Sequence, residues 1–191
     1  MSSKFFLSFF LTERLTNMSN EVNNVNLELL GMEVVDAVTN FKGVVSSISY
    51  DLYGCIQAVV SPYVNEKGEV GSGKWFDTIR LKETGPSRAM TLPVFADYAV
   101  DRETKISPVE LLGLRVEDSV SRLKGVVSHV SYDLPGCILV CVYPPVNCDG
   151  SLSSEKWVDI GRIKITDHEP VMAQPAFAKI KGSVDKPDFC N

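Results

Sequence analysis

This chain of 191 residues contains few of the residues that form structural zinc sites. It has two histidines and five cysteines, with no Cys-x-x-Cys pair. Structural zinc sites need closely spaced Cys and His ligands, so we expect no metal. The odd, sparse set also argues against the dense disulfide framework of small secreted domains. We expect reduced thiols, mostly buried as small apolar side chains, at Cys55, Cys137, Cys141, Cys148 and Cys190.

Basic residues are also fewer than acidic residues. The sequence has 19 Lys and Arg against 24 Asp and Glu, which gives a formal net charge of −5. Proteins that bind nucleic acid neutralise its phosphates with a basic excess on at least one face. The charge therefore argues against a nucleic-acid partner.

Long apolar runs are missing as well. The run Phe5–Leu11 is too short to span a bilayer, so we expect no membrane association. No small-x-small cleavage site follows it, which argues against secretion. Three interpretations of the N-terminal segment stay open. Translation begins at Met18 rather than Met1, the segment is an arm that docks on a partner, or it is a signal peptide.

What the chain does contain is a repeat. Leu29-Leu30-Gly31 recurs as Leu111-Leu112-Gly113, an offset of 82 residues (111 − 29), and the same offset holds without a gap to Ala96 and Ala178. Roughly half of the positions are identical, so the chain is a tandem duplication of a unit of roughly 70 residues.

Each unit has the pattern of short β-strands. In the first copy we expect strands over Glu33–Val38, Gly43–Tyr50, Cys55–Val60 and Trp75–Lys82, with a tight turn at residues 51–54. Turns that recur about every ten residues favour a small closed barrel over an Ig-like sandwich of about seven strands. The predicted fold class is mainly β, with two tandem SH3-like β-barrels.

Helix is expected only at the start of each barrel. Ser107 stands three residues before Glu110, with a proline between them at the first helical position, which is a capping box. The predicted organisation is a flexible N-terminal arm (1–25), a first barrel (26–96), a charged linker (97–106), a second barrel (107–178) and a flexible C-terminal tail (179–191).

The repeated pattern Lys-Gly-Val-Val, then Tyr-Asp-Leu-x-Gly-Cys, then Trp-x-Asp-x-x-Arg resembles a group of small uncharacterised tailed-bacteriophage proteins. In the first copy the matching residues are Gly43, Val45, Gly54–Gln57, Pro62 and Trp75–Leu81. The second copy departs from that pattern, with Leu139 in place of Gln57 and Val158 in place of Phe76. The resemblance covers both repeats. It implies a phage origin, in the host cytoplasm or the virion, and brings no established activity.

Catalytic motifs are missing. The sequence contains no nucleophile elbow, P-loop, HExxH or GxGxxG motif. The two histidines, His129 and His168, have Ser47 and Pro86 at the equivalent positions of the first copy. We expect a protein that is not an enzyme and that needs no cofactor.

The candidate binding residues are aromatic and basic side chains present in both copies. Aromatic residues on one face of a small barrel can form a rigid ligand platform, and nearby cations would suit an anionic ligand. The alternative is that each tryptophan closes its barrel and each cation is solvated. The candidates are Tyr50, Trp75, Arg80, Lys82 and Lys42 in the first copy, and Tyr132, Trp157, Arg162, Lys164 and Lys124 in the second.

Three functions follow from these observations. The first is a non-catalytic phage assembly protein whose duplicated barrels contact a protein partner or copies of itself as a homo-oligomer. The second is a protein that sequesters a small anionic ligand such as a nucleotide. The third is a nucleic-acid-binding module, against which the charge argues.

Overall fold

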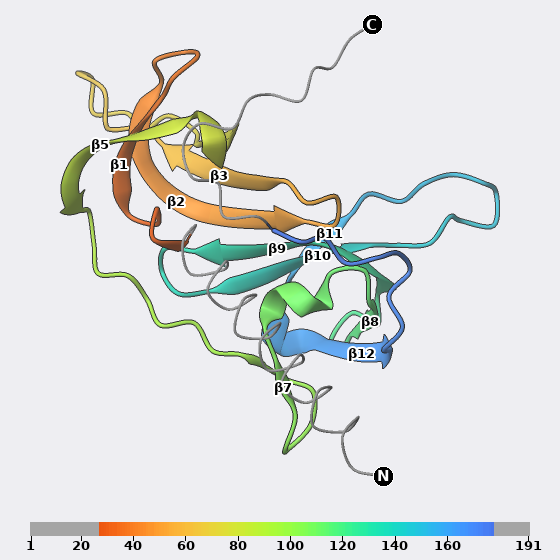
Figure 1. The fold of residues 1–191 in the computed structure, drawn as a ribbon. Coiled ribbons are helices and arrows are strands. Elements are labelled where there is room, and N and C mark those ends of the chain that lie inside the picture. The colour runs from red at the N-terminus through yellow and green to blue at the C-terminus, as the bar shows by residue number, and fades with distance from the viewer. Residues whose placement is uncertain (1–26, 178–191) are drawn as a thin grey trace, which may run out of the picture.

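Short β-strands dominate residues 27–177, the part of the chain that a computed structural model describes (Figure 1). The predicted flexible segments 1–25 and 179–191 lie outside these residues. None of the described helices has the length and apolar composition that crossing a membrane requires. The elements of the first repeat are β1 (Met32–Asp36), β2 (Lys42–Asp51), β3 (Ile56–Ser61), β4 (Lys74–Asp77), the 3-10 helix η1 (Thr78–Arg80) and β5 (Leu81–Arg88).

The second repeat contains the same elements in the same order, preceded by a further 3-10 helix. They are the 3-10 helix η2 (Pro108–Leu111), β8 (Arg115–Asp118), β9 (Lys124–Asp133), β10 (Ile138–Tyr143), β11 (Lys156–Asp159), the 3-10 helix η3 (Ile160–Arg162) and β12 (Ile163–Asp167). Between the repeats, β6 (Tyr98–Ala99) and β7 (Lys105–Ile106) form a small hairpin inside the predicted linker.

The prediction of mainly β structure is confirmed, and the prediction of closed barrels is wrong. Within each repeat five antiparallel strands follow the order β4-β3-β2-β1-β5, or β11-β10-β9-β8-β12. The two end strands of each set do not pair with each other among the described residues. A 3-10 helix stands where we predicted the continuous strand Trp75–Lys82, and it carries the chain from one end of the set to the other.

The two repeats join into one ten-stranded sheet through the antiparallel pairing of β2 with β9. We call this pairing the seam. Ser49 lies opposite Ser131, its own equivalent at the offset of 82, and Ile48 lies opposite Tyr132, the equivalent of Tyr50. Such a register is isologous, because each repeat offers the same strand to the other about a two-fold axis. An edge of β2 is therefore used to bind the second repeat.

The backbone contacts on either side of the seam are reciprocal. The Leu52 N–H donates to the Ser128 carbonyl at 2.8 Å, and the Leu134 N–H donates to the Ser46 carbonyl at 2.8 Å. These two bonds are related by the same offset of 82 residues. The chain is thus an internal pseudo-dimer whose two halves are covalently linked.

A row of four aromatic rings runs through the core at the seam. The rings of Tyr50 and Tyr132 meet edge to face, with centroids 5.9 Å apart. Phe177, which follows β12, packs on Tyr50 at 5.0 Å, and Phe95, which follows β5, packs on Tyr132 at 5.0 Å. Each repeat therefore sends the segment after its last strand onto the other repeat, and the two share one core.

Several local predictions are confirmed. Ser107 and Glu110 form both bonds of the capping box at the start of η2. The glycines that end the two tight turns, Gly54 and Gly136, have φ values of +93° and +100°, a conformation that glycine adopts without strain. The cysteines differ from expectation: Cys141 is buried, whereas Cys55, Cys137 and Cys148 are exposed.

Candidate functional site

The predicted aromatic platform does not exist as one surface. Tyr50 and Tyr132 are buried at the seam, so neither ring is part of an exposed platform. Burial raises the pKa of both phenols well above the usual value, which keeps them neutral. These two positions are identical in the two repeats because they build the shared core.

The tryptophans are exposed and far apart. Trp75 on β4 and Trp157 on β11 are 50% and 43% exposed, so neither closes a barrel. Their strands stand at opposite ends of the run β4-β3-β2-β9-β10-β11, with four strands between them. Trp157 lies beside His129, with ring centroids 5.8 Å apart. The two indoles therefore belong to two separate surfaces.

Both candidate arginines form ion pairs with buried carboxylates. Nε and Nη2 of Arg80 donate to the two carboxylate oxygens of Asp36 at 2.9 and 2.8 Å, and Arg162 makes the same fork with Asp118. The arginine bonds hold the pKa of each buried carboxyl far below its ordinary range. Asp77 is closer to Arg80 in the sequence, but the salt bridge of Arg80 is with Asp36 on β1.

The candidate lysines flank one position of each repeat. Lys42 and Lys82 lie opposite Val35 on its two neighbouring strands, and all three side chains share one face. In the second repeat Lys124 and Lys164 lie in the same way on either side of Glu117. A valine in one copy and a carboxylate in the other give these surfaces different charge.

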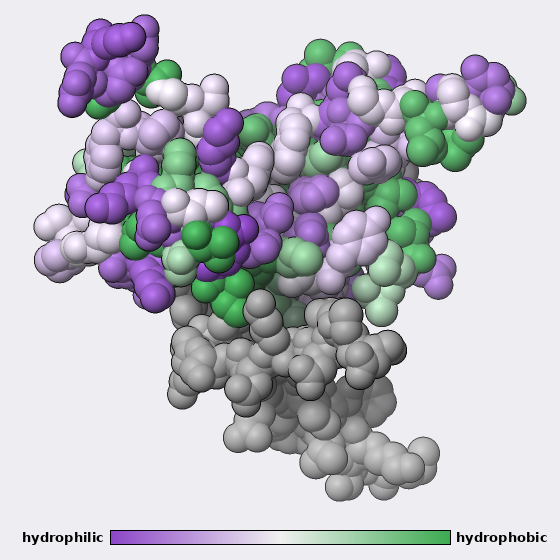
Figure 2. Space-filling view, turned by 90° about the horizontal axis from the view of Figure 1, so that it is seen from above, coloured by the Kyte–Doolittle hydropathy of each residue, from purple (hydrophilic) through white to green (hydrophobic). Residues whose placement is uncertain are grey.

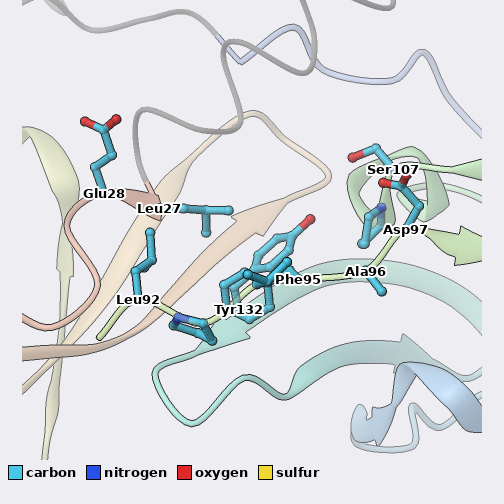
Figure 3. A pocket seen from close by; sticks show the side chains of 11 residues that line it. Leu27, Glu28, Leu92, Phe95, Ala96, Asp97, Ser107 and Tyr132 are labelled. Carbon is cyan, nitrogen blue, oxygen red and sulfur yellow. The ribbon is translucent and has the colours of Figure 1, made fainter. Parts of the chain in front are cut away.

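A cavity of about 520 Å³ lies between the repeats (Figure 3). Its walls are apolar residues of the segment after β5, including Leu92 and Phe95, together with the ring of Tyr132. The charged groups among its lining residues are the carboxylates of Glu28 and Asp97. With two carboxylates and no cation among its lining residues, this cavity does not favour an anionic ligand.

Cations gather in a different place, an open groove of about 860 Å³ between the β8–β9 turn and the β10–β11 hairpin. We call it the basic groove. Of the predicted residues only Lys124 lines it; Arg122 and Lys156 were not predicted. Its apolar walls include Leu123, Pro144 and Val146.

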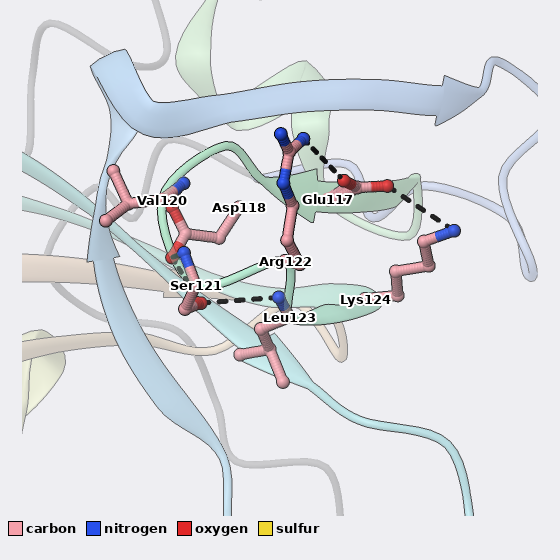
Figure 4. A network of polar contacts seen from close by, with 7 residues as sticks. All are labelled: Glu117, Asp118, Val120, Ser121, Arg122, Leu123 and Lys124. Atoms are coloured by element: carbon pink, nitrogen blue, oxygen red, sulfur yellow. Dashed lines mark hydrogen bonds and ion pairs between the residues drawn. The ribbon is translucent and has the colours of Figure 1, made fainter.

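One carboxylate forms ion pairs with two of these cations (Figure 4). Glu117 accepts from Nη1 of Arg122 at 3.2 Å and lies 3.4 Å from Nζ of Lys124. These bonds lower the pKa of the Glu117 carboxyl, so it carries its full charge at neutral pH. Lys156 donates to the neutral hydroxyl of Ser154 at 3.2 Å. The groove thus keeps an excess of positive charge.

Each repeat also projects a long hairpin between its third and fourth strands. Residues 62–73 form the first tip and residues 144–155 the second tip. They point away from the body at opposite ends, the first as the gold loop at upper left and the second as the light-blue loop at right in Figure 1. In Figure 2 the first is mostly hydrophilic and the second carries a hydrophobic patch.

An asparagine side chain organises each tip. Oδ1 of Asn65 accepts from the backbone N–H groups of Lys67 and Glu69, both at 2.9 Å. Asn147 takes the same place in the second tip, where its Nδ2 donates to Ser151. Both tips are therefore pre-formed, which lowers the entropy that a partner must remove on binding.

The tips expose apolar pairs beside charge. Val64 and Val70 face each other across a bridge in the first tip and are 58% and 70% exposed. Val146 and Leu152 are the exposed equivalents in the second tip. A comparison of where the two copies differ would have drawn attention to the tips and the groove, since Asn40 is replaced by Arg122 and Glu66 by Cys148.

No protein-family model, curated protein or solved structure matches the chain. Within residues 27–177, no group of three or more His, Cys, Asp and Glu side chains gathers as metal ligands would. The function is therefore inferred from the seam, the basic groove and the two tips.

Proposed function

We propose that the protein is a non-catalytic assembly protein that associates with copies of itself through the hairpin tips. The observation that carries the proposal is the placement of two pre-formed tips with exposed apolar pairs at opposite ends of one two-fold body. A body of this kind can bridge two neighbours at once, which converts weak contacts into strong overall binding.

The finer parts of the proposal rest on the sequence. A phage origin is supported by the resemblance of both repeats to tailed-phage proteins. An SH3-like character for each repeat is supported by the five-strand order β4-β3-β2-β1-β5 and by the 3-10 helix before the last strand. The edges left open by the missing closure, such as β4 and β11, each begin with a lysine, a residue that discourages unspecific strand pairing.

Replacing the apolar pairs of the tips by threonine is expected to abolish self-association without unfolding the protein. The test variant is Val64→Thr/Val70→Thr/Val146→Thr/Leu152→Thr. Threonine is β-branched like valine and is polar, so it suits exposed positions, and the Tm should change by less than about 3 °C. Sedimentation velocity over a wide concentration range should show a monomer where the wild type forms larger species.

The matched control is Val38→Thr/Val120→Thr, which changes two equally exposed valines outside the tips. This variant should sediment like the wild type. A wild type that stays monomeric throughout the range would overturn the proposal, and so would a tip variant that associates as strongly as the control.

Binding of a small anionic ligand is the second candidate function. It is favoured by the convergence of Arg122, Lys124 and Lys156 in the basic groove. The lining residues of that groove include no aromatic side chain on which a base could stack, so a nucleotide fits it less well than an extended acidic segment.

A further inference from the structure

We propose that the basic groove of one copy binds the acidic first tip of another copy. This inference rests on the proposed self-association and names the two surfaces that meet. The contact is head to tail, because the two partners are different surfaces of the same chain.

The groove offers the chemistry that an acidic, apolar segment needs. Arg122, Lys124 and Lys156 present three cations, of which two share the single charge of Glu117. Leu123, Pro144 and Val146 supply apolar wall between them. An occupant should therefore carry carboxylates at its rim and small apolar side chains at its centre.

The first tip has that composition. Its bridge pair, Val64 and Val70, is exposed on one side of the hairpin, and Glu66 and Glu69 flank it at the turn. Oε2 of Glu69 is held by Nδ2 of Asn65 at 2.9 Å. Lys67 is the one cation in the stretch from Val64 to Val70, so that stretch carries a net negative charge.

The equivalent surfaces of the other repeat are poorer partners. At the positions of Arg122 and Cys148 the first repeat has Asn40 and Glu66, so its groove would hold one cation fewer and a carboxylate of its own. In the second tip Asp149 is bonded to both the N–H and the hydroxyl of Ser151. The duplication has thus diverged into one acidic end and one basic end.

The contact has to form between copies rather than within one. The first tip and the hairpin that builds the basic groove stand at opposite ends of the molecule in both views (Figures 1 and 2). Head-to-tail contacts of this type produce rings where the rotation closes and open chains where it does not.

Charge reversal on either surface is the direct test, with the full chain and sedimentation velocity as the readout. Lys124→Glu/Lys156→Glu reverses the groove, and Glu66→Lys/Glu69→Lys reverses the tip. Each variant alone should associate about a hundredfold more weakly than the wild type, because like charges would face each other. An equimolar mixture of the two should associate again, since every contact between unlike variants pairs opposite charges.

The matched control is Lys42→Glu/Lys74→Glu, which makes the same change at the equivalent positions of the first repeat. It should associate as the wild type does. Rescue in the mixture also shows that both reversed variants are folded. If the wild type associates and the groove variant associates equally well, or if the mixture gives no rescue, the tip–groove contact is wrong while self-association stands. A monomeric wild type overturns both.

Discussion

Replacing Tyr50 by alanine is expected to lower the free energy of unfolding by about 4 kcal/mol, the usual cost of deleting a large buried ring. Tyr50 is fully buried and packs edge to face on Tyr132 and Phe177, which come from the other repeat. The cavity would therefore open in the core that both halves share. Calorimetry should show one transition at a Tm lower by roughly 10 °C.

Tyr53→Ala is the control for this experiment. Tyr53 lies three residues away and is 75% exposed, so its loss should change stability by less than about 0.5 kcal/mol. Two separate transitions in the Tyr50→Ala variant, or a Tm equal to that of the control, would show that the repeats do not share a core.

Loss of the buried carboxylate in the second repeat is the other large effect. Asp118→Asn leaves Arg162 without its ionic partner and disturbs the bonds from Ser121 and Val120 that hold the β8–β9 turn. Arg162 is 42% exposed and can be hydrated, so the cost comes from the lost bonds to the buried carboxylate. We expect Tm to fall by roughly 10 °C. Asp167→Asn, in the exposed pair with Arg115, should change Tm by less than about 3 °C.

The same pair makes a prediction about pH. The pKa of Asp118 is far lower in the folded protein than in the unfolded chain, where it is about 4. Its contribution to stability is complete above that value and disappears as the pH falls toward the folded pKa. The wild-type Tm should therefore drop steeply below about pH 4, and the Tm of Asp118→Asn should drop less over the same range. Parallel curves in a calorimetric pH series would contradict this assignment.

The local structure could largely be predicted from the sequence because short-range patterns determine it. A composition rich in Val, Ile and Ser predicted β2, a glycine at a fixed position predicted the turn at Gly54, and Ser107 with Glu110 predicted η2. The pairing of β2 with β9 was not predictable in this way. It joins strands about 80 residues apart, and nothing in either strand alone specifies which edge it will meet.

The candidate residues could not be separated from fold residues by sequence, because identity between the copies indicates a shared fold as readily as a shared binding surface. Tyr50 and Arg80 are identical in the two repeats because one builds the seam and the other neutralises a buried carboxylate. The exposed groove and tip depend on positions where the copies differ, such as Arg122 and Glu66. The shared residues Tyr50 and Arg80 serve the fold, so the proposed contact is argued from exposed positions where the two halves differ.

Native mass spectrometry of the gently purified chain tests the central claim of self-association most directly. The chain has a mass of 21.0 kDa, and the account predicts species of two or more chains, at whole multiples of that mass with nothing added. A bare single chain would contradict it. A single chain that carries a reproducible excess in the range of a small metabolite, lost on heating, would contradict it. That result would make the binding of a small anionic ligand the function to pursue.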